Sequence, residues 1–258
     1  MVPAGLGVVW FGGVGLAIAG ILVGVLMWHE YWSVTTGNKS HELRSAFAGT
    51  FILILCLMFE LGSQYFSVVC GAGLALIALL FILDRTLPFR WLIVGLAYIS
   101  AAVLSLLLIR AQEGYGLFLT IAIMVSVWST DIAAYFAGRG FGGPRLSPTN
   151  SPNKTWSGAA GAVVCAALIG AMIAGIIKAP LWPWLVFSGT ISMVAQLGDL
   201  IQSGWKRRFG VKDSGNMIPG HGGVLDRLDS FSMALVFTGG LLLLFPELPV
   251  QFLGLDTE

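Results

Sequence analysis

Two polar stretches of the chain, residues 128–158 and 199–229, carry side chains of the types that bind phosphate and metal ions. The second stretch contains both carboxylates and basic side chains: Asp199, Asp213, Asp226 and Asp229, with Lys206, Arg207, Arg208, Lys212 and Arg227. Carboxylate oxygens bind hard cations, and lysine and arginine bind phosphate oxygens, so this mixture suits a metal–phosphate site. The charges alone leave a second interpretation open, a solvated loop on the basic side of a membrane.

Glycines and a histidine interrupt the second stretch at Pro219-Gly-His-Gly-Gly223. Glycines allow the backbone to approach a ligand closely, and backbone N–H groups can bind anions. The pattern therefore favours a ligand-binding loop, and a simple turn that contains His221 is the alternative. Asp226 and Asp229 follow directly, and they share one helix face if the last helix begins there.

The rest of the chain is mostly apolar, with 57% hydrophobic and 10% charged residues and a mean hydropathy of +0.87. A soluble domain carries about 25% charged residues, so the composition excludes an ordinary soluble fold. A membrane-spanning helix needs ~20 mostly apolar residues. We therefore expect an all-α polytopic membrane protein with about eight membrane-spanning helices, at residues 4–28, 46–62, 65–83, 91–109, 116–137, 157–177, 181–201 and 230–252.

These elements place the polar stretches at helix ends, and Asp131 and Asp199 come near the ends of otherwise apolar segments. We treat residues 1–115 as N-terminal transmembrane helices and residues 116–258 as a C-terminal catalytic region of the same membrane unit. If the helices alternate in direction, twelve of the 14 basic residues share one side: Lys39, Arg44, Arg85, Arg90, Arg139, Arg145, Lys154, Lys206, Arg207, Arg208, Lys212 and Arg227. The positive-inside rule then places both polar stretches in the cytoplasm and both termini outside.

The run from Ser203 to Asp229 resembles the signature of the phosphatidate cytidylyltransferase (CDP-diacylglycerol synthase) family. The matching residues are Ser203, Lys206-Arg207, Lys212-Asp213, Pro219-Gly-His-Gly-Gly223, Asp226-Arg227 and Asp229. Similar residues lie upstream: Asp131, Ala134-Tyr135, Gly138-Arg139, Ser151-Pro152 and Lys154-Thr155-Trp156, and Trp28-His-Glu30-Tyr-Trp32 after the first span.

This resemblance implies an enzyme that converts CTP and phosphatidate to CDP-diacylglycerol and pyrophosphate with Mg²⁺, and it leaves a second cation open. It implies that Asp199 and Asp226 are the principal metal ligands, and we expect Asp229 to be a third. Catalytic roles are expected for Asp199, Asp226, Asp213, Lys212 and Ser203. Substrate contacts are expected from Lys206, Arg207, His221, Gly222, Gly223, Arg227, Arg139, Lys154 and Asp131.

The expected partners are CTP, phosphatidate and membrane lipid; we expect no nucleic-acid partner, and a homodimer is left open. Two residues depart from the family pattern, since the family usually has Glu where Ser157 and Gln202 stand. A catalytically impaired family member is therefore one alternative. A second is another CTP-dependent lipid enzyme, such as a polyprenol kinase, and the chain has no G-x-x-x-x-G-K-[ST] phosphate loop. A third alternative, an anion transporter, is disfavoured because transporters place their polar residues near the bilayer midplane.

Overall fold

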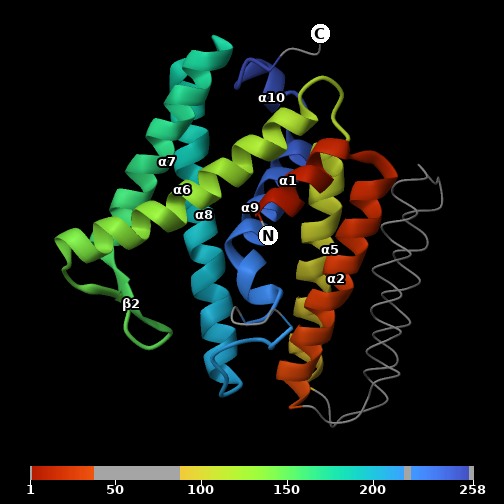
Figure 1. Ribbon diagram of the computed structural model, residues 1–258, viewed down its shortest axis with the longest axis vertical. Helices are drawn as coiled ribbons and strands as arrows, with labels where there is room; N and C mark the ends of the chain where they lie inside the picture. The colour runs from red at the N-terminus through yellow and green to blue at the C-terminus, as the bar shows by residue number, and fades with distance from the viewer. Residues whose placement is uncertain (1, 38–87, 218–221, 256–258) are drawn as a thin grey trace. The chain divides into compact units, whose positions relative to one another are not determined.

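The computed structural model describes residues 2–37, 88–217 and 222–255. This part of the chain is mostly helical (Figure 1), with α1 (Val2–Phe11), α2 (Gly13–Thr36), α5 (Phe89–Arg110), α6 (Gly116–Phe141), α7 (Trp156–Ile177), α8 (Leu181–Arg208), α9 (Leu225–Leu244) and α10 (Leu248–Gln251). One antiparallel hairpin, β1 (Arg145–Ser147) and β2 (Ser151–Thr155), lies between α6 and α7. Six helices of the described residues are long and apolar enough to cross a membrane, which confirms the expected all-α polytopic class.

Several helix boundaries differ from those expected from the sequence. The first apolar run is divided at Gly12, whose φ of 62° and ψ of −154° interrupt the helix, and α2 then continues to Thr36. At the other end of the chain, α8 continues to Arg208 and α9 already begins at Leu225. Polar side chains that we placed in loops therefore lie on helices. The expected spans 46–62 and 65–83 lie outside the described residues.

The chain divides into two compact units. The first contains the described residues within 1–107 and 208–228, and the second contains the described residues within 108–207 and 229–258. The sequence gives no sign of this division, because α8 and α9 each contribute residues to both units.

In the first unit, α2 and α5 run side by side (Figure 1), and aromatic side chains join them. The Tyr31 hydroxyl donates a hydrogen bond of 2.9 Å to the carbonyl oxygen of Trp91. The ring of Tyr31 fits against Gly95, where an added Cβ would lie only 2.1 Å from the ring. Trp91 in turn makes an edge contact with Phe209, with the ring centroids 5.8 Å apart, and the guanidinium of Arg208 lies over the Trp91 ring. These contacts fasten the segment that follows α8 to α5.

In the second unit, small residues allow α6 and α7 to pack closely. A Cβ added at Gly158 would lie 2.8 Å from the backbone oxygen of Ala134 and 3.3 Å from the Cα of Gly138. Such small-residue contacts are a common way for membrane helices to approach each other. The C-terminal half of α6 and the N-terminal half of α7 are therefore held at a fixed distance.

The opposite face of α7 is apolar and exposed. Val164, Leu168, Met172 and Ile176 are each at least 58% exposed and recur at intervals of four residues, so they form one stripe along the helix. An apolar stripe of this kind on a long helix suits contact with lipid chains, because a soluble protein would bury it. This face of α7 is therefore suited to contact with the membrane.

The helix α8 packs antiparallel to α7 and also contacts α9. A Cβ added at Gly170 would lie 2.3 Å from the backbone oxygen of Trp184, while Gln196, farther along α8, donates to the backbone oxygen of Ala159. On its other side, a Cβ added at Gly198 would lie 2.5 Å from the Met233 Cβ. Gly170 thus allows α7 to pack against the start of α8, and Gly198 brings the C-terminal part of α8 close to α9.

Candidate active site

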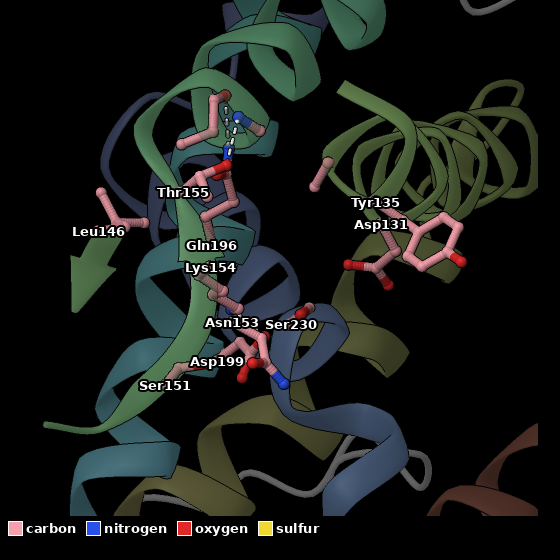
Figure 2. A pocket seen from close by; sticks show the side chains of 13 residues that line it. Asp131, Tyr135, Leu146, Ser151, Asn153, Lys154, Thr155, Gln196, Asp199 and Ser230 are labelled. Atoms are coloured by element: carbon pink, nitrogen blue, oxygen red, sulfur yellow. Dashed lines mark hydrogen bonds and ion pairs between the residues drawn. The ribbon is translucent and has the colours of Figure 1, made fainter. Parts of the chain in front are cut away.

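A cavity of about 350 Å³ lies in the second unit, at the polar ends of its helices (Figure 2). Its size falls in the usual range of ligand pockets, ~300–1,000 Å³. Its lining residues come from α6, the hairpin, α7, α8 and α9: Asp131, Ala134, Tyr135, Leu146, Ser151, Asn153, Lys154, Thr155, Gly158, Ala159, Gln196, Asp199 and Ser230. The pocket thus collects residues that are up to a hundred positions apart (131–230). Three of the predicted site residues, Asp131, Lys154 and Asp199, are among them.

The hairpin that carries Lys154 is anchored to the start of α7. Thr155 caps this helix, because its Oγ1 accepts a hydrogen bond of 3.1 Å from the N–H of Gly158. The N–H of Trp156 donates to the backbone oxygen of Pro144, and the Ser157 hydroxyl donates to the backbone oxygen of Gly142. These bonds fix the strand β2 and hence the position from which Lys154 projects.

Lys154 forms an ion pair with Asp199, which joins the hairpin to α8. The carboxylate of Asp199 also accepts a hydrogen bond of 3.2 Å from the Ser203 hydroxyl, one turn further along the same helix. Both members of the ion pair are partly accessible, with side chains 30% and 26% exposed. A ligand that enters the pocket can therefore reach both charges. Ser203 and Asp199 were both predicted as site residues, and the structure brings them together.

Two further carboxylates and a second lysine interact electrostatically with this ion pair or with each other. Asp131, on α6, lies within the field of both Asp199 and Lys154. Asp229, on α9, feels the charges of Asp199, Lys206 and Asp131. Asp131, Lys154, Asp199, Lys206 and Asp229 thus interact electrostatically, and we call these five residues the polar cluster. Carboxylates and ammonium groups are the side-chain types that bind hard cations and phosphate oxygens.

Asp131 and Tyr135 line the side of the pocket that α6 contributes; in Figure 2 the Asp131 carboxylate lies toward β2, whereas the Tyr135 ring is turned away from it. The hydroxyl of Tyr135 accepts a hydrogen bond of 2.8 Å from Arg139, one turn further along α6. Arg139 was predicted to contact substrate. It is exposed, and its hydrogen bond to Tyr135 connects it to a residue that lines the pocket. Tyr135 was only part of a family motif in the sequence, and the structure adds it to the pocket.

The turn of the hairpin also contacts the end of α8. A Cβ added at Gly204 would lie 3.2 Å from the Asn150 amide nitrogen, and the Arg207 side chain donates to the Asn150 backbone oxygen at 3.5 Å. Arg207 was predicted to bind substrate and is exposed. Lys206, its neighbour on the helix, is 8% exposed and points to the interior of the unit. Two adjacent basic residues therefore occupy different environments.

The predicted residues of the first unit cluster around Asp226. The Asp226 Oδ2 accepts hydrogen bonds from the N–H groups of Ser214, at 2.8 Å, and Gly223, at 3.1 Å. Gly222 has a φ of +82°, and a Cβ at this position would lie 3.2 Å from the same oxygen. Glycine is therefore required where the loop passes over the carboxylate. Lys212, Asp213 and Arg227 are exposed, and His221 lies outside the described residues.

The expected metal ligands fall in both units, with Asp226 in the first and Asp199 and Asp229 in the second. Within residues 2–37, 88–217 and 222–255, no three His, Cys, Asp or Glu side chains gather in an arrangement that holds a metal ion. The chemistry of the donors nevertheless fits Mg²⁺, which prefers oxygen ligands and a small number of carboxylates. The assignment of Asp199, Asp226 and Asp229 to a metal stays a prediction.

Sequence reasoning missed several residues that the structure brings into these sites. Asn153, Gln196 and Ser230 line the pocket, and Glu30 and Ser214 bond to the loop before α9. Glu30 carried a usable signal, because a carboxylate within an apolar span is costly unless it has a role. The others are uncharged residues whose types are common in loops and helices.

Together, the fold and the pocket define a polytopic membrane protein with a charged, phosphate-compatible site at the ends of its helices. The sequence matches the model of the cytidylyltransferase family over residues 1–245. The chain belongs to this family, and so to the nucleotidyltransferases. The match includes both units and all of the predicted site residues.

Individual relatives agree with this assignment. The chain is 37% identical to a phosphatidate cytidylyltransferase of Brucella suis over 243 residues, which cover 93% of this chain and 89% of the relative. It is 39% identical to a phosphatidate cytidylyltransferase of Bacillus subtilis over 209 residues, or 75% of this chain and 77% of the relative. The similarity to the Brucella protein therefore extends over nearly the whole length of both chains.

Proposed function

We propose that the protein is a phosphatidate cytidylyltransferase, which converts CTP and phosphatidate to CDP-diacylglycerol and pyrophosphate. The observation that carries the proposal is the similarity along nearly the whole chain to relatives with this name. The polar cluster around Lys154 and Asp199 supports it, because a reaction between two phosphate compounds needs cations and carboxylates together. The exposed apolar face of α7 supports a lipid substrate that remains in the membrane.

The proposed reaction needs no protein nucleophile. A phosphate oxygen of phosphatidate attacks the α-phosphorus of CTP and forms the new phosphorus–oxygen bond. The bond from this phosphorus to the oxygen that bridges to the β-phosphorus breaks, and pyrophosphate leaves in line. Because the attacking phosphate is already an anion, no strong general base is required. Catalysis then depends on positioning and on neutralising charge.

The residues of the chain divide into those that hold phosphate and those that hold a cation. We assign phosphate oxygens to Lys206, Arg207, Lys212 and Arg227, and substrate contacts to Lys154, Arg139, Asp131, Gly222, Gly223 and His221. We assign Mg²⁺ to Asp199, Asp226 and Asp229, with Ser203, Lys212 and Asp213 as further participants in the site. Mg²⁺, when bound, supplies positive charge that stabilises the phosphates in the transition state.

The active site is proposed to face the cytoplasm, with both termini on the outer side. The partition of basic residues supports this orientation, because twelve of the 14 fall on one side when the helices alternate. It also gives the site access to cytoplasmic CTP. A homodimer is left open, and nothing in the proposed reaction requires one.

An assay with purified protein tests the proposed function. The protein is incubated with phosphatidate, Mg²⁺ and CTP labelled at both the α- and the γ-phosphorus, and the lipid fraction is analysed for label. We expect a labelled lipid with phosphatidate and none when a polyprenol or diacylglycerol replaces it. Labelling of the polyprenol instead would show a lipid kinase and reject the proposal. No labelled lipid from either would indicate an impaired family member.

A further inference from the structure

The side chain of Glu30 is buried in the first unit, 2% exposed, six positions before the end of α2. A carboxylate within a span this apolar is rare and costly, and it persists where it has partners and a role. Its neighbours Trp28, Tyr31 and Trp32 are also buried, so the side chain is shielded from solvent. Glu30 lies in the aromatic motif Trp28-His-Glu30-Tyr-Trp32 and takes no part in the proposed reaction.

Three hydrogen bonds connect Glu30 to the loop that precedes α9. Its Oε1 accepts from the N–H of Val224 at 2.8 Å. Its Oε2 accepts from the N–H of Leu225 at 2.9 Å and from the hydroxyl of Ser214 at 3.0 Å. Val224 and Leu225 stand at the start of α9, where backbone N–H groups have no partner within the helix. Glu30 therefore satisfies the first N–H groups of α9 from a distant part of the chain.

Ser214 connects Glu30 to Asp226. Its hydroxyl donates to Glu30, while its backbone N–H donates to the Asp226 Oδ2 at 2.8 Å. The same Asp226 oxygen accepts from the N–H of Gly223. Glu30 and Asp226 thus both bond to Ser214, which links the two carboxylates directly.

Two glycines of the loop are explained by this buried carboxylate. A Cβ added at Gly223 would lie 2.5 Å from Glu30 Oε2 and 2.3 Å from Ser214 Oγ. A Cβ added at Gly215 would lie 2.9 Å from Glu30 Oε1. Both approaches are closer than real side chains allow, so the loop fits around Glu30 only because these positions lack side chains. Gly223 is the last residue of the Pro219–Gly223 segment, which links this packing to the signature loop.

We propose that Glu30 is a positioning residue, which holds Ser214, Val224 and Leu225 in place and thereby sets the orientation of the Asp226 carboxylate. It does not touch the substrates. The proposal rests on the proposed function in that Asp226 belongs to the active site, but the ordering of the loop is a property of the protein without substrate. A misplacement of about 1 Å at a reacting group can cost ~100-fold in rate, so a lost anchor should lower turnover strongly.

The test replaces Glu30 by Gln, which keeps the size but places an amide N–H₂ against the loop's donors. The matched control is Thr36→Val on the same helix. Thr36 is also buried, at 7% exposed, and its hydroxyl donates to the backbone oxygen of Trp32 within α2. Hydrogen–deuterium exchange of residues 211–225 is measured in nanodiscs without substrate, together with kcat and the KM for CTP.

We expect Glu30→Gln to exchange at least tenfold faster at residues 211–217 and 222–225 and to lower kcat at least tenfold, with the KM for CTP changed less than threefold. Thr36→Val should match wild type in all three. Unchanged exchange, or a kcat within twofold of wild type, overturns the proposal. If Glu30→Gln does not accumulate in membranes, the same measurements are made on Ser214→Ala. We expect its exchange rate to rise and its kcat to fall at least threefold, and wild-type values of both would overturn the proposal. A wild-type protein that transfers no cytidylyl group rejects the proposed function, and the exchange result still decides the role of Glu30 in the loop.

Discussion

Lys154 forms an ion pair with Asp199, although the two residues are 45 positions apart and lie on different kinds of element. The hairpin supplies the ammonium group and α8 supplies the carboxylate. Each charge lowers the cost of placing the other in a partly buried pocket. A phosphate that enters the pocket meets Lys154 as a donor, while Asp199 remains held by Ser203.

Removal of the Lys154 charge should weaken substrate binding more than it slows chemistry. We expect Lys154→Gln to raise the KM for CTP or phosphatidate about tenfold, because a charge-assisted contact to phosphate is lost. The effect on kcat should be smaller. The control is Lys178→Asn at the other end of α7, where φ is 57° and Asn tolerates the left-handed conformation. Steady-state kinetics in mixed micelles give both constants. An unchanged KM for both substrates would contradict the role of Lys154.

Substitutions of Asp199 and Asp226 should impair the same catalytic step. We expect Asp199→Asn and Asp226→Asn each to cost several orders of magnitude in turnover, equivalent to at least ~3–4 kcal/mol of barrier. Asn keeps the size of the side chain but is a weaker ligand for a hard cation. The double variant should be scarcely slower than either single variant, because both act on the same step. Near-normal turnover of either single variant at saturating Mg²⁺ would reject the metal assignment.

The two departures from the family pattern should be secondary. Gln202→Ala should lower turnover much less than Asp226→Ala, and Gln202→Glu should alter the Mg²⁺ concentration needed for half-maximal rate. Ser157 donates to the Gly142 backbone oxygen, so Ser157→Glu also removes a bond that anchors the hairpin. Activity measured against Mg²⁺ concentration distinguishes these variants. If Gln202→Ala lost turnover as completely as Asp226→Ala, the prediction that Gln202 is secondary would be wrong.

Close packing of α6 against α7 should depend on Gly158. The Cβ of Gly158→Ala would lie 2.8 Å from the Ala134 backbone oxygen, so the helices must separate. We expect a loss of ~1–3 kcal/mol in stability, as for other overpacked sites, and a lower detergent melting temperature. Gly175→Ala on the same helix is the control, since no atom lies within 4 Å of its added Cβ. Equal melting temperatures for the two variants would contradict this account of the packing.

The orientation of the chain can be tested at the two ends of α6. Its 26 residues span ~39 Å, enough to cross the bilayer, so Glu113 before it and Thr149 after it should face opposite sides. In a background without native cysteines, we expect Glu113→Cys to react with an impermeant reagent from outside intact cells. Thr149→Cys should react only after the membrane is opened. The reverse pattern would place the site outside the cytoplasm.

Much of the fold was predictable, because composition and the length of apolar runs determine a membrane protein of helices. The charge clusters also indicated Asp199 and Asp226 as candidate site residues, and the resemblance to the family signature added Ser203. The sequence did not show that Tyr135, Asn153 and Gln196 line a pocket with Asp199, since their types carry no signal and their proximity arises from helix packing.

The helix ends were predicted less well. At the ends of α2 and α8, polar residues continue the helix into regions that hydropathy assigns to loops. Hydropathy marks where the apolar run ends, whereas the helix ends where its backbone hydrogen bonding stops. Glu30 lies in such a polar helix end, and its hydrogen-bond partners are far away in the sequence. Leu225, for example, is 195 positions further along the chain. No local pattern predicts such a pairing.

The position of the label in CTP decides the central claim most directly. Purified protein, phosphatidate and Mg²⁺ are incubated with CTP labelled at either the α- or the γ-phosphorus. Cytidylyl transfer predicts that the α-label enters the lipid and the γ-label leaves as pyrophosphate, in equal amounts. A γ-label in the lipid would show a kinase instead and would contradict the account.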